Sequence, residues 1–146
     1  MMSEKHDEYI ASLRLKINNW LQSEVGKRNR WSKYIALTPD IFQLLCRLAV
    51  EKRLDDSQKA RIGAAIAYFV SPLDLIPEQY WGAHGFVDDI GMAAYVLRSI
   101  DPEILSDHWA LGQPASEIVN EILLSAEEMM GGRIWQQIQD LADKGH

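Results

Sequence analysis

The sequence predicts an all-α fold, a compact bundle of about six or seven helices in a single helical domain over residues 1–146. Apolar residues recur at spacings of three and four along most of the chain, which is the helical period, and no segment alternates as a strand would. Prolines and most glycines fall between these segments. The length suffices for one hydrophobic core without a metal or a disulfide, and 47% hydrophobic with 25% charged residues is typical of a globular protein.

The first half of the chain predicts two helices with a basic loop between them. Apolar positions at helical spacing predict an amphipathic helix over residues 4–25, with Gly26 placed to end it. After the loop, Thr38 as N-cap and Pro39 at the first helical position predict a second helix running toward Arg53.

The next helix, over residues 58–70, is predicted to be the central and most buried element because residues 62–70 are apolar on all sides. One of three consecutive polar residues should cap it, namely Asp55, Asp56 or Ser57. Pro72 must stop this helix and Pro77 constrains the chain again, which predicts an ordered and buried connection over residues 71–77.

Beyond this connection the sequence predicts an exposed turn or short helical excursion over residues 78–85, and then four more helices. One runs from near Asp88 to Ile100, and a short one opens at Asp101–Pro102 and reaches about Trp109. Gly112 and Pro114 break the chain again. The last two helices are expected over residues 116–130 and 132–141.

The charge distribution argues against nucleic acid as a partner. The net charge is −6, and residues 57–146 carry 5 basic and 13 acidic side chains, whereas phosphate-backbone binding relies on clustered Lys and Arg. The basic loop is the one cluster of that kind, and it consists of Lys27, Arg28, Arg30 and Lys33 around Trp31. We expect it to be a solvated loop, and the alternative is peripheral contact with a membrane surface.

Several features predict a soluble, cytoplasmic protein. The N-terminal residues 1–8 are polar and acidic, unlike a signal peptide, and the most apolar segment is shorter than a membrane-spanning helix. Cys46 is the single cysteine, so an internal disulfide is excluded, and its apolar surroundings predict a buried small side chain.

Acidic residues in an apolar stretch mark the candidate site. Between Arg61 and Arg98 the chain has no Lys or Arg, yet it carries Asp74, Glu78, Asp88 and Asp89. The structural interpretation makes Asp88 an N-cap, places Asp89 in the first helical turn and lets Asp74 close an Asx-type turn.

The functional alternative is a metal site. In it the four acids converge with His84, supplying oxygen ligands suited to Mg²⁺, Mn²⁺ or Ca²⁺, with the imidazole shifting the preference toward a transition metal. Such a metal could activate water in a phosphoesterase-like hydrolase, with His84 or Glu78 as general base. No phosphate-binding loop or nucleophile motif accompanies these residues, so we prefer the non-enzymatic interpretation.

The same region resembles a known family. The string SPLDLIPE at residues 71–78, followed by the Asp88–Asp89 pair, fits the pattern S-P-[IL]-D-L-I-P-[DE] … D-D of the YkvA-like family, a bacterial domain of unknown function. The resemblance covers about residues 60–100, and residues 80–85 depart from the pattern with a connection about one residue longer. It implies a YkvA-like core over 57–100 with flanking helices over 1–56 and 101–146. It supports a site and names no reaction.

A third class of function is an interaction module. Tyr80, Trp81, Trp109 and the Met129–Met130 pair could present an apolar groove, a homodimer face or a contact for a protein partner, although such residues usually belong to a core. Taken together, the sequence predicts a soluble, non-enzymatic regulatory or scaffolding module with a structural acidic connection.

Overall fold

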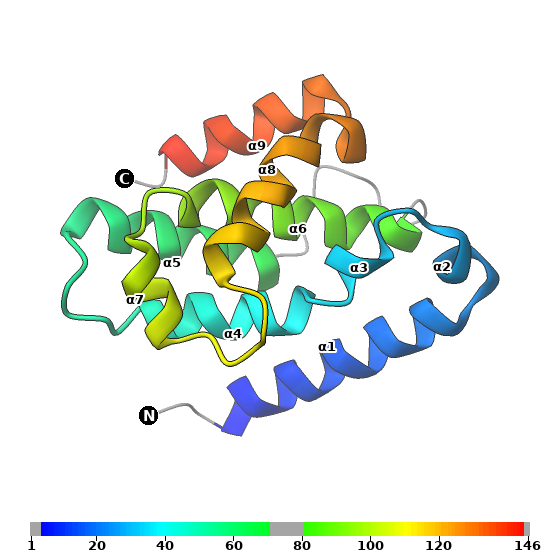
Figure 1. Ribbon diagram of the computed structural model, residues 1–146, viewed down its shortest axis with the longest axis horizontal. Coiled ribbons are helices and arrows are strands. Elements are labelled where there is room, and N and C mark those ends of the chain that lie inside the picture. Colours follow the sequence, from blue (N-terminus) through cyan, green and yellow to red (C-terminus); the bar gives the residue numbers. More distant parts are fainter. Residues whose placement is uncertain (1–3, 71–80, 145–146) are drawn as a thin grey trace.

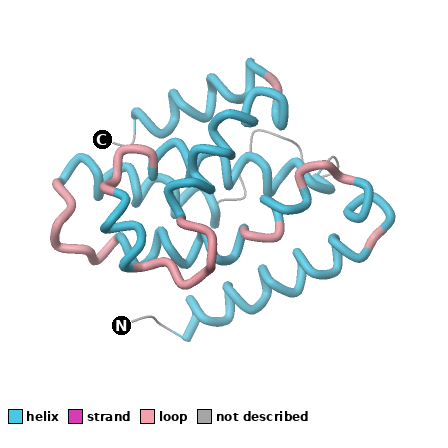
Figure 2. Tube along the Cα trace, viewed as in Figure 1, coloured by secondary structure: helices cyan, strands magenta, loops and turns pink. Residues whose placement is uncertain are grey.

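A computed structural model describes residues 4–70 and 81–144, with side chains described from residue 7 onward except at residues 25 and 81–85. Within these residues the chain forms nine helices and no strand, which confirms the predicted all-α bundle (Figures 1 and 2). The number exceeds the predicted six or seven because two short helices occupy the expected basic loop. No described helix combines the length and the apolar character that crossing a bilayer requires.

The helices follow one another with short connections. The first four are α1 (Glu4–Gln22), α2 (Glu24–Arg28), α3 (Ser32–Ile35) and α4 (Thr38–Leu48). The next three are α5 (Asp56–Val70), α6 (Trp81–Leu97) and α7 (Pro102–Asp107), and the last two are α8 (Ala115–Met130) and α9 (Gly132–Lys144).

Helix α6 is the centre of the bundle, and α4, α5, α8 and α9 pack against it (Figure 1). Every residue from Val87 to Leu97 is buried. Helix α1 lies at the periphery, where it packs on α4. The prediction that the helix over residues 58–70 would be the most buried was wrong: α5 leaves Gly63, Ala67 and Val70 exposed. Burial depends on how many helices surround an element. Helices α8 and α9 cover α6 more extensively than they cover α5.

The first helix ends earlier than predicted, and Gly26 has a different role. Helix α1 stops at Gln22, and Ser23 caps α2 with its Oγ, which accepts a hydrogen bond from the backbone N–H of Gly26 at 3.1 Å. A Cβ at Gly26 would lie 1.9 Å from the carbonyl oxygen of Trp20. Gly26 is therefore required by the close approach of α2 to the end of α1, and it does not terminate α1.

The start of α4 differs from the prediction by one residue. Leu37 is the N-cap, and Thr38 is the first helical residue; its hydroxyl donates to the carbonyl of Ile35 at 2.6 Å, with the residue fully buried. Pro39 is therefore the second helical residue, one position later than predicted, and still lies in the first turn, where its missing N–H costs no intrahelical bond. The helix ends at Leu48 and does not continue toward Arg53.

Local polar signals placed two other helix starts correctly. Asp55 accepts a hydrogen bond from the backbone N–H of Gln58 at 2.7 Å, and the Gln58 side chain accepts from the N–H of Asp55 at 3.0 Å, which is a reciprocal capping box for α5. Asp101 caps α7 by accepting from the N–H of Glu103 at 2.8 Å.

Candidate functional site

The described residues include only part of the predicted metal site. Asp74 and Glu78 lie outside them, as does the predicted connection over residues 71–77. His84 belongs to α6, but its side chain is outside the described residues as well. The side chains of Asp88 and Asp89 are described, and both lie on α6. The convergence of all five residues therefore stays a prediction.

Asp88 and Asp89 do not occupy the start of a helix. Helix α6 begins at Trp81, so Asp88 is its eighth residue. The interpretation of Asp88 as an N-cap and of Asp89 as a first-turn residue was wrong. Two glycines suggested a turn over residues 78–85, but each costs a helix only about 1 kcal/mol, which favourable packing of α6 can outweigh. The helix macrodipole acts within the first turn and has little effect this far along α6.

Both carboxylates are buried in the core. Asp88 is 0% exposed and Asp89 is 8% exposed, and their neighbours Val87 and Ile90 are core residues. Each of the two side chains interacts with other groups of the chain. Since a buried charge is costly unless it is paired and hydrogen-bonded, these interactions are a requirement for α6 to sit where it does.

The described residues limit the chemistry of this pair. Among them, no three His, Cys, Asp or Glu side chains come together in a group that could hold a metal ion. Asp88 and Asp89 supply two oxygen-donor side chains, so the metal hypothesis depends on the predicted ligands Asp74, Glu78 and His84.

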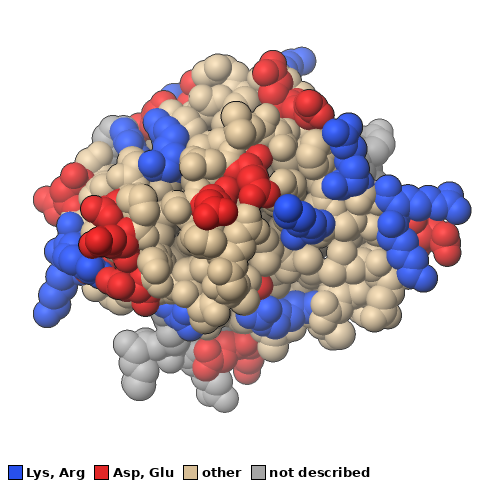
Figure 3. Space-filling model, viewed as in Figure 1, with Lys and Arg blue, Asp and Glu red and all other residues tan. Residues whose placement is uncertain are grey.

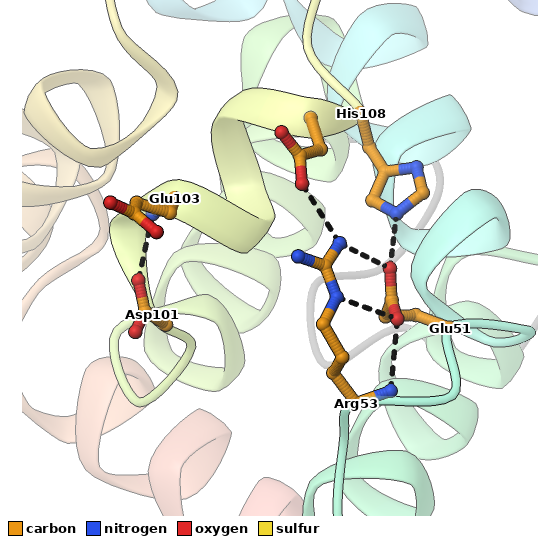
Figure 4. A network of polar contacts seen from close by, with 6 residues as sticks. Glu51, Arg53, Asp101, Glu103 and His108 are labelled. Carbon is orange, nitrogen blue, oxygen red and sulfur yellow. Dashed lines mark hydrogen bonds and ion pairs between the residues drawn. The ribbon is translucent and has the colours of Figure 1, made fainter.

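A second polar cluster, which the sequence did not predict, joins α7 to the turn between α4 and α5 (Figure 4). We call it the Glu51 cluster, and it comprises Arg47, Glu51, Arg53, Asp107 and His108. Oε2 of Glu51 accepts from Nε of Arg53 at 3.0 Å, and Oε1 lies 2.8 Å from both Nη2 of Arg53 and Nε2 of His108. Nη2 of Arg53 also donates to Asp107 at 2.9 Å, and Arg47 donates to the carbonyl of His108 at 3.1 Å.

This arrangement perturbs the ionisation of its members. The hydrogen bonds from Arg53 and then from His108 hold the pKa of Glu51 well below its usual range, and Glu51 in turn raises the pKa of Arg53. Sequence patterns could not identify the cluster because Glu51 and His108 are 57 residues apart. His108 is the C-cap residue of α7.

The basic loop is folded into helices α2 and α3, and acidic side chains accompany its charges (Figure 3). Three ion pairs involve it: Arg28 with Glu24 at 3.6 Å, Arg30 with Glu128 at 3.3 Å, and Lys33 with Glu121 at 3.2 Å. The hydroxyl of Tyr34 donates to Glu121, and this bond, followed by that from Lys33, lowers the pKa of Glu121. The pairing with α8 weakens the case for a membrane-binding basic surface.

Four of the remaining candidates, Trp109, Met129, Met130 and Cys46, lie in or against the core, while Tyr80 and the side chain of Trp81 are outside the described residues. Met129 and Met130 are buried, and Trp109 is half-buried with its indole N–H donating to the carbonyl of Gln113 at 2.9 Å. Cys46 is half-buried against the core, and burial raises the pKa of its thiol to about 11. This thiol is therefore protonated at neutral pH and a poor nucleophile.

Comparison with known proteins adds a family match over part of the chain. Residues 58–95, which run from α5 into α6, match a family described as a protein of unknown function, DUF1232. The chain is 32% identical over 73 residues to an uncharacterised protein, ORF9, of Methanothermobacter thermautotrophicus. The alignment covers 50% of each protein, so the chain spans half the length of this relative. No solved structure matches the chain.

Proposed function

We propose that this chain is a non-enzymatic regulatory or scaffolding module in which Asp88 and Asp89 organise the packing of the central helix. The single observation that supports this most is their burial, 0% and 8% exposed in the middle of α6. A catalytic carboxylate must reach a substrate or a water molecule. A carboxylate enclosed among core residues is better suited to fixing how neighbouring segments pack.

The unit that carries this role is proposed to be the YkvA-like core over residues 57–100. The family match over residues 58–95 supports it, because that match spans the same α5–α6 region as the S-P-L-D-L-I-P-E string. Helices α4, α8 and α9 pack against α5 or α6, and we propose that they flank this core within one domain. A cytoplasmic location fits a chain whose single cysteine excludes an internal disulfide.

Calorimetric titration of Mg²⁺, Mn²⁺, Ca²⁺ and Zn²⁺ into chelator-treated protein tests this proposal. We expect no micromolar binding to the wild-type chain, and a lower melting temperature for Asp88→Asn and Asp89→Asn. The matched control is Asp140→Asn, since Asp140 is an exposed acid on α9 that contacts Gln136 at 3.1 Å. Its melting temperature should stay close to that of the wild type.

Micromolar binding that disappears in Asp88→Asn but persists in Asp140→Asn would contradict the structural role. It would support the alternative, a metal site formed by Asp74, Glu78, His84, Asp88 and Asp89. The hydrolase would then be the function to test, with a phosphate ester as substrate.

A scaffolding module also needs a partner, and we propose a second copy of the chain or another protein. The support is the presence of large exposed hydrophobic side chains on separate helices, such as Leu124 at 86% and Leu15 at 63%. Light scattering at two concentrations tests self-association. A mass equal to that of one chain at both concentrations would exclude a homodimer. The partner would then have to be a different protein.

A further inference from the structure

Helix α5 ends at a sequence that cannot cap it in the usual way. The last four carbonyl groups of a helix have no partner within it, and a glycine just beyond the end commonly lets the chain turn back to satisfy them. Val70 is the last residue of α5, and Ser71 and Pro72 follow it. Pro72 has no N–H group, so it cannot close a tight turn onto the carbonyl of Phe69, three residues earlier. This carbonyl therefore depends on a donor from outside α5.

Tyr9 of α1 supplies such a donor. Its hydroxyl donates to the carbonyl oxygen of Phe69 at 2.9 Å, across 60 residues of sequence, and the bond is partly buried. A carbonyl that is shielded from water loses more when its hydrogen bond is removed than one that faces solvent. The bond thus joins α1, which lies outside the family match over residues 58–95, to α5, in which that match begins.

A row of three aromatic rings holds this hydroxyl in place. The ring of Tyr9 packs on Phe42 of α4 with centroids 4.8 Å apart, and Phe42 packs on Phe69 with centroids 5.1 Å apart. The two pairs are tilted, with interplanar angles of 52° and 53°, and both phenylalanines are buried. Tilted rings at such distances attract one another, so α4 and α5 together fix the direction in which the Tyr9 hydroxyl points.

Other contacts fix the position of α1 along α4 (Figure 1). The buried face of α1 consists of apolar side chains at helical spacing, namely Ile10, Leu13 and Ile17. On the same helix, Nη2 of Arg14 donates to Oδ1 of Asp40 on α4 at 3.0 Å. These contacts place the Tyr9 ring beside α4 and α5 without the help of its hydroxyl.

We propose that Tyr9 is a positioning residue, which fixes the C-terminal end of α5 and with it the point at which the string SPLDLIPE leaves that helix. The string begins at Ser71, directly after α5. Helix α1 is then part of the unit that positions the string and not a separate flanking element. Tyr9 has this role whether Asp88 and Asp89 serve packing or hold a metal.

Hydrogen exchange of the full chain carrying Tyr9→Phe tests this role, because the substitution removes the hydroxyl and keeps the ring. The reporters are the amides of Phe69 and Val70 in the last turn of α5, and the reference is the amide of the buried Ile122 in the middle of α8. We expect protection of the reporters to fall about fivefold relative to the reference, which corresponds to one lost hydrogen bond. The carbonyl carbon chemical shift of Phe69 should change as well, since it senses that bond directly.

Tyr95→Phe is the matched control. It removes a different hydrogen bond between helices, from the Tyr95 hydroxyl of α6 to Asp143 of α9 at 3.0 Å, and should lower the overall stability to a similar extent. A loss of overall stability lowers the protection of reporters and reference together, so their ratio and the Phe69 carbonyl shift should stay as in the wild type. An unchanged ratio in Tyr9→Phe, or an equal fall of the ratio in Tyr95→Phe, would overturn the proposal.

Discussion

The hydroxyl of Tyr95 on α6 lies 3.0 Å from both carboxylate oxygens of Asp143 on α9. Trp135 of α9 packs edge-on against the Tyr95 ring, with centroids 6.0 Å apart, and the guanidinium of Arg98 lies 3.7 Å from the ring centroid. Burial and then the Asp143 contact raise the pKa of Tyr95, so the phenol is protonated and donates this hydrogen bond. Tyr95 thus joins the last helix to the central one through both a hydrogen bond and ring packing.

Removing this hydroxyl should weaken the attachment of α9. We expect Tyr95→Phe to lower the free energy of unfolding by about 1 kcal/mol, since one hydrogen bond is lost while the ring packing is kept. Urea denaturation measures it. Asp140→Asn, on the same helix but hydrogen-bonded to Gln136, is the control. An unchanged midpoint in Tyr95→Phe would show that the Tyr95 bond contributes nothing net.

Two glycines in helices should respond to alanine in opposite directions. At Gly26 a Cβ would collide with backbone atoms of Trp20, so Gly26→Ala must displace α2 and should destabilise the fold by about 2 kcal/mol or more. At Gly63 nothing lies within 4 Å of the added Cβ, and alanine favours a helix, so Gly63→Ala should stabilise by about 0.5–1 kcal/mol. Thermal unfolding of both variants measures the effects. Similar melting temperatures for the two would contradict the close contact between α1 and α2.

Glu51 should make stability depend on pH in acid. Its pKa is lower in the folded chain than in the unfolded chain, so its contribution is fully present above the unfolded value of about 4.3 and is lost as pH falls toward the folded value. We expect Glu51→Gln to lower the melting temperature by a few degrees near pH 6, and by progressively less as the solution is acidified. A gap between the two proteins that is constant from about pH 6 to about pH 2 would exclude this linkage.

Substitution by alanine should change stability much more at a core leucine than at a surface leucine. Leu44 on α4 is 1% exposed and lines the interface with α6 and α8, so Leu44→Ala should cost about 2–5 kcal/mol through lost burial and a new cavity. Leu124 on α8 is 86% exposed, and Leu124→Ala should change stability by less than about 0.5 kcal/mol. Chemical denaturation provides both values. A cost for Leu124→Ala as large as that for Leu44→Ala would indicate that its face of α8 is buried in an assembly.

Much of the fold was predictable because its signals are local. The cap of α5, the Asp101–Pro102 start of α7 and the break between α8 and α9 each depend on a few neighbouring residues. The structure has the last two as predicted, and the cap is Asp55, one of the three predicted candidates. The apolar positions Ile118, Val119 and Ile122 also face the core as their spacing indicates.

The errors arose where tertiary packing, and not local sequence, determines the structure. Both α5 and α6 are rich in apolar residues, and only the arrangement of α8 and α9 makes α6 the central helix. The early start of α6 overrides the turn character of its glycines. Gly91, inside α6, lets Met130 of α8 approach so closely that a Cβ there would lie 2.5 Å from the methionine methyl group. Periodicity alone does not reveal such a close approach.

The candidate site was likewise predictable only in part. The acidic stretch identified Asp88 and Asp89 as unusual, and both are buried, but their helical setting depended on where α6 begins. The Glu51 cluster joins residues more than 50 positions apart, and no spacing rule connects them.

Because a single residue connects α8 to α9, this connection should not tolerate insertions or deletions. Gly131 has φ 86°, a conformation that glycine adopts readily, and it alone sets the direction in which α9 leaves α8. One inserted residue would turn the buried side of α9 by about 100° around its axis, carrying Ile138 away from the core. Descendants of this sequence should therefore gain or lose residues in the loop around Gly112, and keep the corner at Gly131 at its present length.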